Sequence, residues 1–205
     1  MAYEGEAKST YNNLLTAGQG KQRQVLNFSR LQGWDPNFLA WDNTTRGFHY
    51  GGRLLDSPGR PYLKYANSPD GSRIHVVATD QHPRDEDNSI YHGVTDGIAL
   101  YDSAGRVLDA DIRDGEAVQP VALTRLFTGD PDNVAWMADV AVDLNDRPVI
   151  AFSVQKDGRG KPKGSGGLDH RYHLARLGDG GWTQRQIAFA GERRRIHDRS
   201  GMQYL

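Results

Sequence analysis

The sequence contains no cysteine, so neither disulfide bridges nor thiolate metal sites are available to this chain. It also lacks an excess of charge, because 25 basic and 26 acidic residues give a formal net charge of −1. No apolar run reaches the roughly 18 residues that a membrane-spanning helix needs. The first residues, Met1–Glu6, have neither the basic nor the apolar segment of a signal peptide. We therefore expect no nucleic-acid and no membrane partner, and the localisation stays open.

Turn-forming residues, in contrast, are plentiful. The chain has 24 glycines and 9 prolines among 205 residues, and hydrophobic residues make up 37%. The clearest consequence lies between Arg60 and Tyr101, where turns containing Ser-Pro-Asp-Gly and Asp-Gly separate short β-patterned runs. These runs are Arg60–Tyr65, Ser72–Thr79, Ser89–Val94 and Ile98–Tyr101. The pattern predicts a four-stranded antiparallel meander.

Similar units lie on both sides of this meander, and the three together cover approximately residues 10–55, 60–108 and 134–190. Meanders that repeat at intervals of roughly 50–60 residues are typical of β-propeller blades, and closed propellers usually have four to eight blades. The sequence therefore predicts an all-β fold: a single, incomplete β-propeller segment over residues 1–205, with about three four-stranded antiparallel blades. Between the second and third units, Ala122–Phe127 fits either a short helix or a strand.

Short motifs in a regular order carry a family resemblance over most of the chain. Among them are Thr10–Asn13, Val25–Arg30, Arg60–Tyr65, Thr79–Arg84 and Asp169–His173, together with Trp41–Phe48, which is similar to a degenerate Asp-box turn. In order and spacing they resemble bacterial BNR-repeat proteins and the related seven-bladed propeller polysaccharide lyases, which include ulvan lyases. That family is typically secreted or periplasmic. The resemblance implies β-elimination on an acidic polysaccharide by the complete propeller.

The same resemblance places catalytic positions at Tyr11, Arg30 and Tyr62. It implies that Arg30 neutralises the carboxylate of a uronic acid, since arginine binds carboxylates with two parallel hydrogen bonds, and that Tyr11 is the acid/base group. The family's histidine pair would precede Tyr11 and is not matched, so we expect this chain alone to be inactive or nearly so. The alternative is that Tyr11 and Arg30 are ordinary strand-end residues.

Three histidines form a second set of candidates for substrate binding. His75 and His92 lie on neighbouring predicted strands, and His82 lies in the loop that joins them. Such a cluster suits a base or a metal site, and equally a polar lining of one sheet face. The acidic residues around His82, from Asp80 to Asp87, leave calcium open but lack the regular ligand spacing of an EF-hand. We therefore assign no metal site and no cofactor.

The motif Asp169–His173 supplies the last substrate-binding candidates, Arg171 and His173, which share one strand face by the period of two. The resemblance places this motif on an inner strand facing the channel, where it suits contacts with a sugar or a sulfate. An outer polar face is the alternative. Four tryptophans fit either sugar stacking or the core between blades: Trp34, Trp41, Trp136 and Trp182.

The function that best fits these features is a carbohydrate-active, lyase-like propeller whose partner is an acidic polysaccharide or oligosaccharide. The alternative is a non-catalytic carbohydrate-binding or interaction module, because propellers also serve as platforms. A sialidase is disfavoured, since no arginine triad can be assembled. The basic loop 156–167 and the run Arg193–Arg195 are interpreted as solvated segments. Two open blade flanks predict a homo-oligomer.

Overall fold

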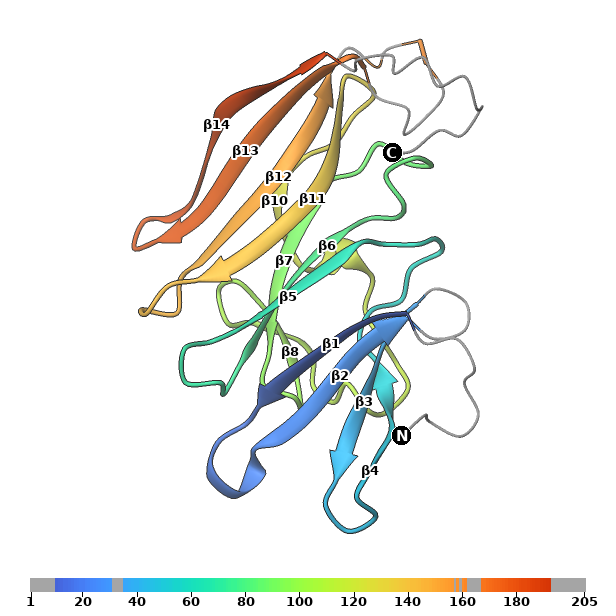
Figure 1. The fold of residues 1–205 in the computed structure, drawn as a ribbon, viewed down its shortest axis with the longest axis vertical. Helices are drawn as coiled ribbons and strands as arrows, with labels where there is room; N and C mark the ends of the chain where they lie inside the picture. The colour runs from blue at the N-terminus through green and yellow to red at the C-terminus, as the bar shows by residue number, and fades with distance from the viewer. Residues whose placement is uncertain (1–9, 31–34, 157, 159, 162–166, 193–205) are drawn as a thin grey trace, which may run out of the picture.

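The computed structural model describes residues 10–30, 35–156, 158, 160, 161 and 167–192. Within these residues the chain is all-β, and its strands form three antiparallel sheets that follow one another in the sequence. Figure 1 shows the sheets arranged along the long axis, with the second sheet between the other two. The predicted all-β propeller segment is thereby confirmed. No helix in the described ranges has the length and apolar character needed to cross a membrane.

The first sheet has the order β1-β2-β3-β4. Its strands are β1 (Thr10–Ala17), β2 (Gln24–Arg30), β3 (Pro36–Asp42) and β4 (Gly47–Arg53). The β1–β2 connection contains one 3-10 turn, η1 (Gly20–Gln22), and begins at Gly18, whose φ is +79°. A Cβ atom at Gly18 would lie 2.5 Å from the Gln22 carbonyl oxygen, so this turn requires glycine.

The second sheet has the order β5-β6-β7-β8-β9, and β10 also pairs with β7. Its strands are β5 (Leu63–Asn67), β6 (Ile74–Thr79), β7 (Ile90–Thr95), β8 (Leu100–Asp102), β9 (Val107–Asp109) and β10 (Thr124–Phe127). The ambiguous segment before the third unit is thus a 3-10 turn, η3 (Pro120–Ala122), followed by a strand. The second sheet therefore extends past the predicted blade end near residue 108.

The third sheet has the order β11-β12-β13-β14. Its strands are β11 (Asn133–Val142), β12 (Pro148–Lys156), β13 (Asp169–Gly178) and β14 (Gly181–Glu192). Burial along β12 alternates residue by residue, as expected for a strand with one face in a core. Three features named from the sequence lie wholly or partly outside the described residues: Trp34, the Arg193–Arg195 run, and positions 157, 159 and 162–166 of the basic loop.

Two hydrophobic cores lie between the three sheets, one on each face of the second sheet. Leu26, Phe28 and Phe38 of the first sheet pack with Ile74 and Val76 of the second. On the other side, Val77 and Ile90 of the second sheet pack with residues of the third, among them Ala135, Ile150, Phe152 and Val154. All residues of β6 and β7 are buried because both faces of the middle sheet are covered.

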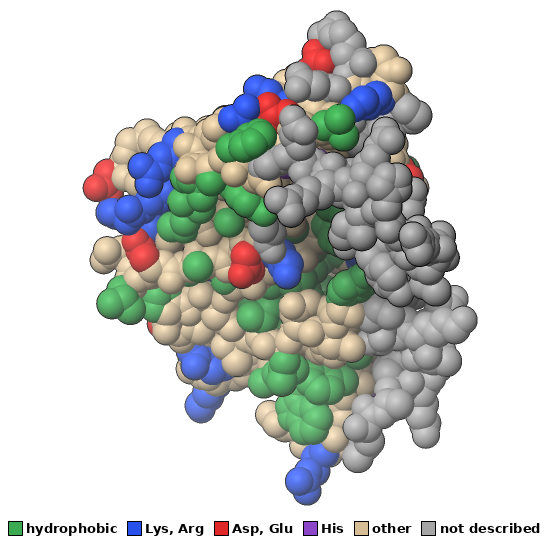
Figure 2. Space-filling view, turned by 45° about the horizontal axis from the view of Figure 1, so that its top comes forward, with side chains coloured by type: hydrophobic (Ala, Val, Ile, Leu, Met, Phe, Trp, Pro, Cys, Tyr) green, Lys and Arg blue, Asp and Glu red, His purple; other side chains and the backbone are tan. Residues whose placement is uncertain are grey.

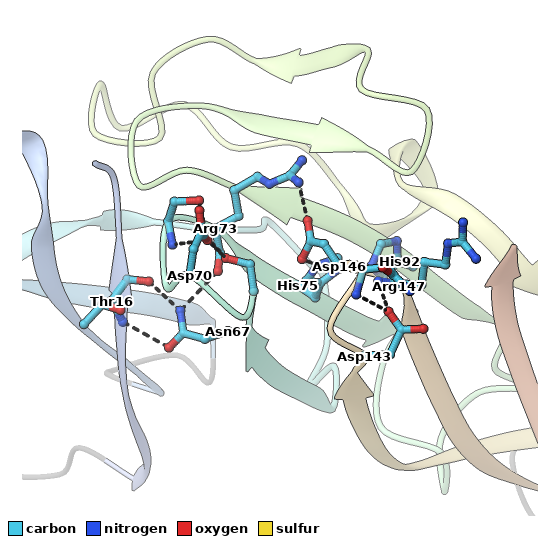
Figure 3. A network of polar contacts seen from close by, with 12 residues as sticks. Thr16, Asn67, Asp70, Arg73, His75, His92, Asp143, Asp146 and Arg147 are labelled. Carbon is cyan, nitrogen blue, oxygen red and sulfur yellow. Dashed lines mark hydrogen bonds and ion pairs between the residues drawn. The ribbon is translucent and has the colours of Figure 1, made fainter. Parts of the chain in front are cut away.

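The first strand of each sheet lies next to its counterpart in the neighbouring sheet. Strand β5 contacts both β1 and β11, and Asn67 at its end donates to and accepts from the backbone of Thr16 in β1. Figure 3 shows this Thr16–Asn67 contact. The ends of these three strands are therefore the places where side chains from all three sheets can meet.

Candidate functional site

Tyr11, Arg30 and Tyr62 lie together at one end of the first two sheets. The guanidinium carbon of Arg30 is 5.0 Å from the ring centroid of Tyr11 and 5.1 Å from that of Tyr62. Antiparallel pairing explains the first contact, because Thr10 at the start of β1 faces Arg30 at the end of β2. Tyr62 immediately precedes β5, which packs beside β1. The three catalytic candidates are thus brought together around one cation.

Arg30 is a buried cation without an acidic partner among the described residues. Only 6% of the residue is exposed, and Nη2 donates to the carbonyl oxygen of Pro61. Nη1 is buried and has no hydrogen-bond partner there. Burial lowers the pKa of Arg30; the two tyrosines oppose this shift, and Arg60 adds to it. A buried charge without a counter-ion is costly, so this site is suited to an anion.

Tyr11 occupies an irregular part of β1. The register with β2 shifts between Thr10 and Asn13, and Tyr11 has a φ of +60°, which few non-glycine residues adopt. The Asn13 side chain donates to the Tyr11 carbonyl oxygen at 2.5 Å. Bulges redirect side chains, and strained backbone is concentrated at functional sites. Tyr11 remains 60% exposed while its ring contacts Arg30.

His82 and Trp136 complete this group from the second and third sheets. The Tyr62 ring lies 5.2 Å from His82 and 6.2 Å from Trp136, and His82 lies 6.0 Å from Trp136, all between ring centroids. The Tyr62 hydroxyl is 3.4 Å from His82 Nε2. We call Tyr11, Arg30, Tyr62, His82 and Trp136 the Arg30 cluster. The sequence indicated Trp136 only as one of four tryptophans, because its contacts with Tyr62 and His82 cross the boundary between the second and third sheets.

The structure does not bring the other two histidine candidates to the Arg30 cluster. His75 in β6 and His92 in β7 are buried, and His75 Nδ1 lies 3.0 Å from His92 Nε2. On its other side, His75 Nε2 lies 2.9 Å from Oδ1 of Asp146, in the turn between β11 and β12. Figure 3 shows this row of side chains joining the second sheet to the third. The contact of Asp146 with His75 was not anticipated from the sequence, since the two residues are 71 positions apart.

Neither the His75–His92 pair nor His82 with its acidic loop is arranged as a metal site. The two ring nitrogens of His75 point to different partners, so His92, His75 and Asp146 do not converge on one point. In the described part of the chain, no group of three or more potential ligands is placed to hold an ion. In the acidic loop, the Asp80 carboxylate accepts hydrogen bonds from the Ser89 backbone and the Tyr91 hydroxyl, both at 2.7 Å.

Arg171 and His173 lie on β13, the third strand of its sheet, whereas β11 is the strand beside β5. The expected inner-strand position of this motif is therefore wrong. Arg171 Nε and Nη2 donate to the two carboxylate oxygens of Asp169 at 2.5 and 2.7 Å, which makes a bidentate ion pair. The Phe189 ring stacks on the same guanidinium. The His173 ring stacks on Phe152 in the core. The charge of Arg171 thus has an internal partner, unlike that of Arg30.

The model of the BNR repeat-containing family matches residues 7–190. Two solved structures of an ulvan lyase from polysaccharide lyase family PL25 are similar, and one is described as bound to -[GlcA(1-4)Rha3S]-. Each superposes with a TM-score of 0.61 at 15% identity, covering 86% of this chain and 43% of the lyase. The chain thus spans less than half of those lyases, and the likeness shows the fold. Comparison with curated protein sequences gives no match.

Proposed function

This chain belongs to the BNR repeat-containing family, and on that premise we propose that the Arg30 cluster binds a uronic acid of an acidic polysaccharide. The observation that carries the proposal is the buried guanidinium of Arg30, which has a donor without a partner and no acidic neighbour among the described residues. A carboxylate is the ligand that best satisfies a planar guanidinium. The oligosaccharide on the similar lyase is of this class, since it contains a uronic acid.

The aromatic side chains around Arg30 support a sugar rather than a small inorganic anion. The rings of Tyr11 and Tyr62 both contact the guanidinium of Arg30, and the Trp136 ring of the third sheet lies 6.2 Å from that of Tyr62. Aromatic rings present apolar faces together with polar edges, a combination that matches the faces and hydroxyl groups of a pyranose. The cluster thus combines one cation for the carboxylate with several rings for the sugar.

The reaction that this arrangement supports is β-elimination. Arg30 would neutralise the uronate carboxylate, which makes the proton on C5 more acidic. After that proton is removed, the electron pair of the C5–H bond forms the C4=C5 double bond as the C4–O bond breaks. Tyr11 would act as the acid/base group that protonates the departing oxygen. Its large exposure leaves the hydroxyl accessible to a bound chain.

Non-catalytic carbohydrate binding is the second candidate. It is favoured by the burial of His75 and His92 in a network at the β11–β12 turn, which leaves His82 as the one histidine of the three at the cluster. Both functions require uronate binding, and only the lyase forms an unsaturated uronate. Ultraviolet absorbance of that product separates the two.

Binding is tested by titrating the chain with a -[GlcA(1-4)Rha3S]- oligosaccharide and with the same oligosaccharide after reduction of its carboxylates to alcohols. We expect the reduced form to bind at least about 10-fold more weakly, because the charge-assisted hydrogen bonds to Arg30 are lost. Arg30→Gln should weaken binding of the intact form to a similar extent. Arg106→Gln is the matched control, since that exposed arginine pairs with Asp102 away from the cluster. Equal binding of both sugars would exclude the proposal.

A further inference from the structure

His82 is held in one tautomer by the backbone. The N–H of Arg84 donates to His82 Nδ1 at 3.0 Å, so this nitrogen is the acceptor of the ring. A neutral imidazole carries its hydrogen on the other nitrogen, which here is Nε2. Nε2 is the atom that lies 3.4 Å from the Tyr62 hydroxyl. His82 therefore presents an N–H group to the oxygen of Tyr62.

The surroundings of His82 favour its uncharged form. Its pKa is lowered chiefly by burial, and then by Arg84, while Asp85 opposes the shift and Arg60 and Arg30 add to it. The Asp85 carboxylate lies 4.0 Å from Nδ1 and is 65% exposed. The His82 ring also contacts the rings of Tyr62 and Trp136. The positive charge of the cluster thus stays on Arg30, beside the expected carboxylate.

Tyr62 and Tyr11 differ in what surrounds their hydroxyl groups. The ring of Tyr62 contacts Arg30 on one side, and its oxygen faces the N–H of His82. A cation thus lies over the Tyr62 ring, and a hydrogen-bond donor faces its oxygen. Tyr11 contacts the same guanidinium, but in the described part of the chain its hydroxyl has no hydrogen-bond partner. The two tyrosines are therefore suited to different steps.

We propose that His82 is the positioning residue that makes Tyr62 the proton acceptor of the site, so that this chain removes the C5 proton without the histidine pair that the family resemblance expects before Tyr11. The proposal rests on the proposed function, because it requires a uronate held on Arg30. Tyr62, after giving its hydroxyl proton to water, takes the proton from C5. The C5–H electron pair is then held as the enolate of the carboxylate on Arg30. In the next step this pair forms the C4=C5 bond as C4–O breaks, and the Tyr11 hydroxyl protonates the leaving oxygen. Proton exchange with water then restores both tyrosines.

The test follows the first half of this reaction by itself. The 205-residue chain is incubated with the -[GlcA(1-4)Rha3S]- oligosaccharide in D₂O, and NMR records the loss of the uronate H5 signal. Binding is measured in parallel. We expect His82→Phe to slow H5 exchange by about 10- to 100-fold, which corresponds to loss of a hydrogen bond to a charged group, while binding changes less than about threefold. Tyr62→Phe should abolish exchange, and the double variant should be no slower than Tyr62→Phe.

Two further variants separate a positioning role from a general loss of structure. His82→Gln keeps a donor near the position of Nε2 and should retain more exchange than His82→Phe. His49→Phe is the control, because His49 is an exposed histidine whose partner is Thr45. Tyr11→Phe should slow elimination more than exchange. ¹⁵N NMR of the unliganded chain should show His82 protonated at Nε2.

The outcomes distinguish the inference from the proposed function. If the wild-type chain does not bind the oligosaccharide, the proposed function fails and this inference falls with it. If the chain binds but shows no H5 exchange, or if His82→Phe exchanges as fast as the wild type, the inference alone is overturned. A His82 ring protonated at Nδ1 would overturn it equally.

Discussion

The Nδ1 atom of His75 lies 3.0 Å from Nε2 of His92, and this contact is the centre of a hydrogen-bonded row. His75 Nε2 faces Asp146 at 2.9 Å, and His92 Nδ1 faces Ser103 Oγ at 2.8 Å. With both rings neutral, every contact is satisfied when Ser103 donates to His92, His92 to His75, and His75 to Asp146. With both rings charged, the two facing nitrogens would both carry hydrogens and repel each other.

The first prediction concerns pH and stability. The pKa of His92 lies well below 6.5, chiefly through burial and then through the charge of His75, and burial also lowers the pKa of His75 against the effect of Asp146. The unfolded chain therefore takes up protons first when the pH falls below about 6.5. We expect the free energy of unfolding to be highest above that pH and to fall between pH 6.5 and pH 5, as measured by urea denaturation.

Histidine variants identify the source of that dependence. His92→Phe removes one of the two groups and should show a shallower fall in stability, whereas His49→Phe should follow the wild type because His49 is exposed. If stability falls equally steeply with pH in the wild type, His92→Phe and His49→Phe, the pH dependence does not come from His92.

The second prediction concerns Asp146, which joins the third sheet to the second. Its carboxylate accepts hydrogen bonds from His75 and from Arg73 (Figure 3), and its φ of +60° is tolerated by asparagine as well. Asp146→Asn should lower the free energy of unfolding by about 1.5–3 kcal/mol, because charge-assisted hydrogen bonds are lost without added backbone strain. Asp179→Asn is the matched control, since its ion pair with Arg147 is at the surface and should contribute less than about 1 kcal/mol. Equal losses of unfolding free energy in the two variants would show that the contacts of Asp146 contribute no more stability than a surface ion pair.

The third prediction compares two arginines in oligosaccharide binding. Arg30→Lys should weaken binding by about 10-fold or more, because lysine lacks the planar fork that meets a carboxylate and contacts two tyrosine rings. Arg171→Lys should weaken it by less than about threefold, since Arg171 is already paired with Asp169 and stacked on Phe189. Isothermal titration of both variants measures the difference. Equal losses would argue against Arg30 as the carboxylate ligand.

The fourth prediction concerns self-association through the third sheet. Three large hydrophobic residues on β13 and β14 are about half exposed: Tyr172 (47%), Ile187 (49%) and Phe189 (53%). Figure 2 shows hydrophobic side chains exposed in several patches of the viewed face. Large apolar side chains exposed on β14, the last strand of its sheet, favour association, so we expect oligomers in light scattering coupled to size exclusion. Ile187→Lys should reduce them, while Val107→Lys on β9, at a similarly exposed position, should not. A monodisperse wild-type monomer would contradict this prediction.

Local chemistry explains why the fold could be anticipated. Hairpins depend on turn residues such as Asp96-Gly97 and on alternation within each strand, and both can be recognised in a short stretch of sequence. The meander from β5 to β8 was predicted on this basis. The sequence left Ala122–Phe127 open between a helix and a strand, because β10 is a strand only through its pairing with β7, which includes Tyr91 and His92.

Tyr11, Arg30 and Tyr62 of the Arg30 cluster were named from a family resemblance, but their contacts follow from packing between sheets. The sequence by itself determined the strand pattern, the turns and the identity of the candidate side chains. Only the tertiary structure decided that His82 meets Tyr62 while His75 meets Asp146, and that Arg171 is paired whereas Arg30 is not. The physical reason is that period and propensity act over a few residues, whereas His82 lies 20 positions from Tyr62 and His75 lies 71 positions from Asp146, in a different sheet.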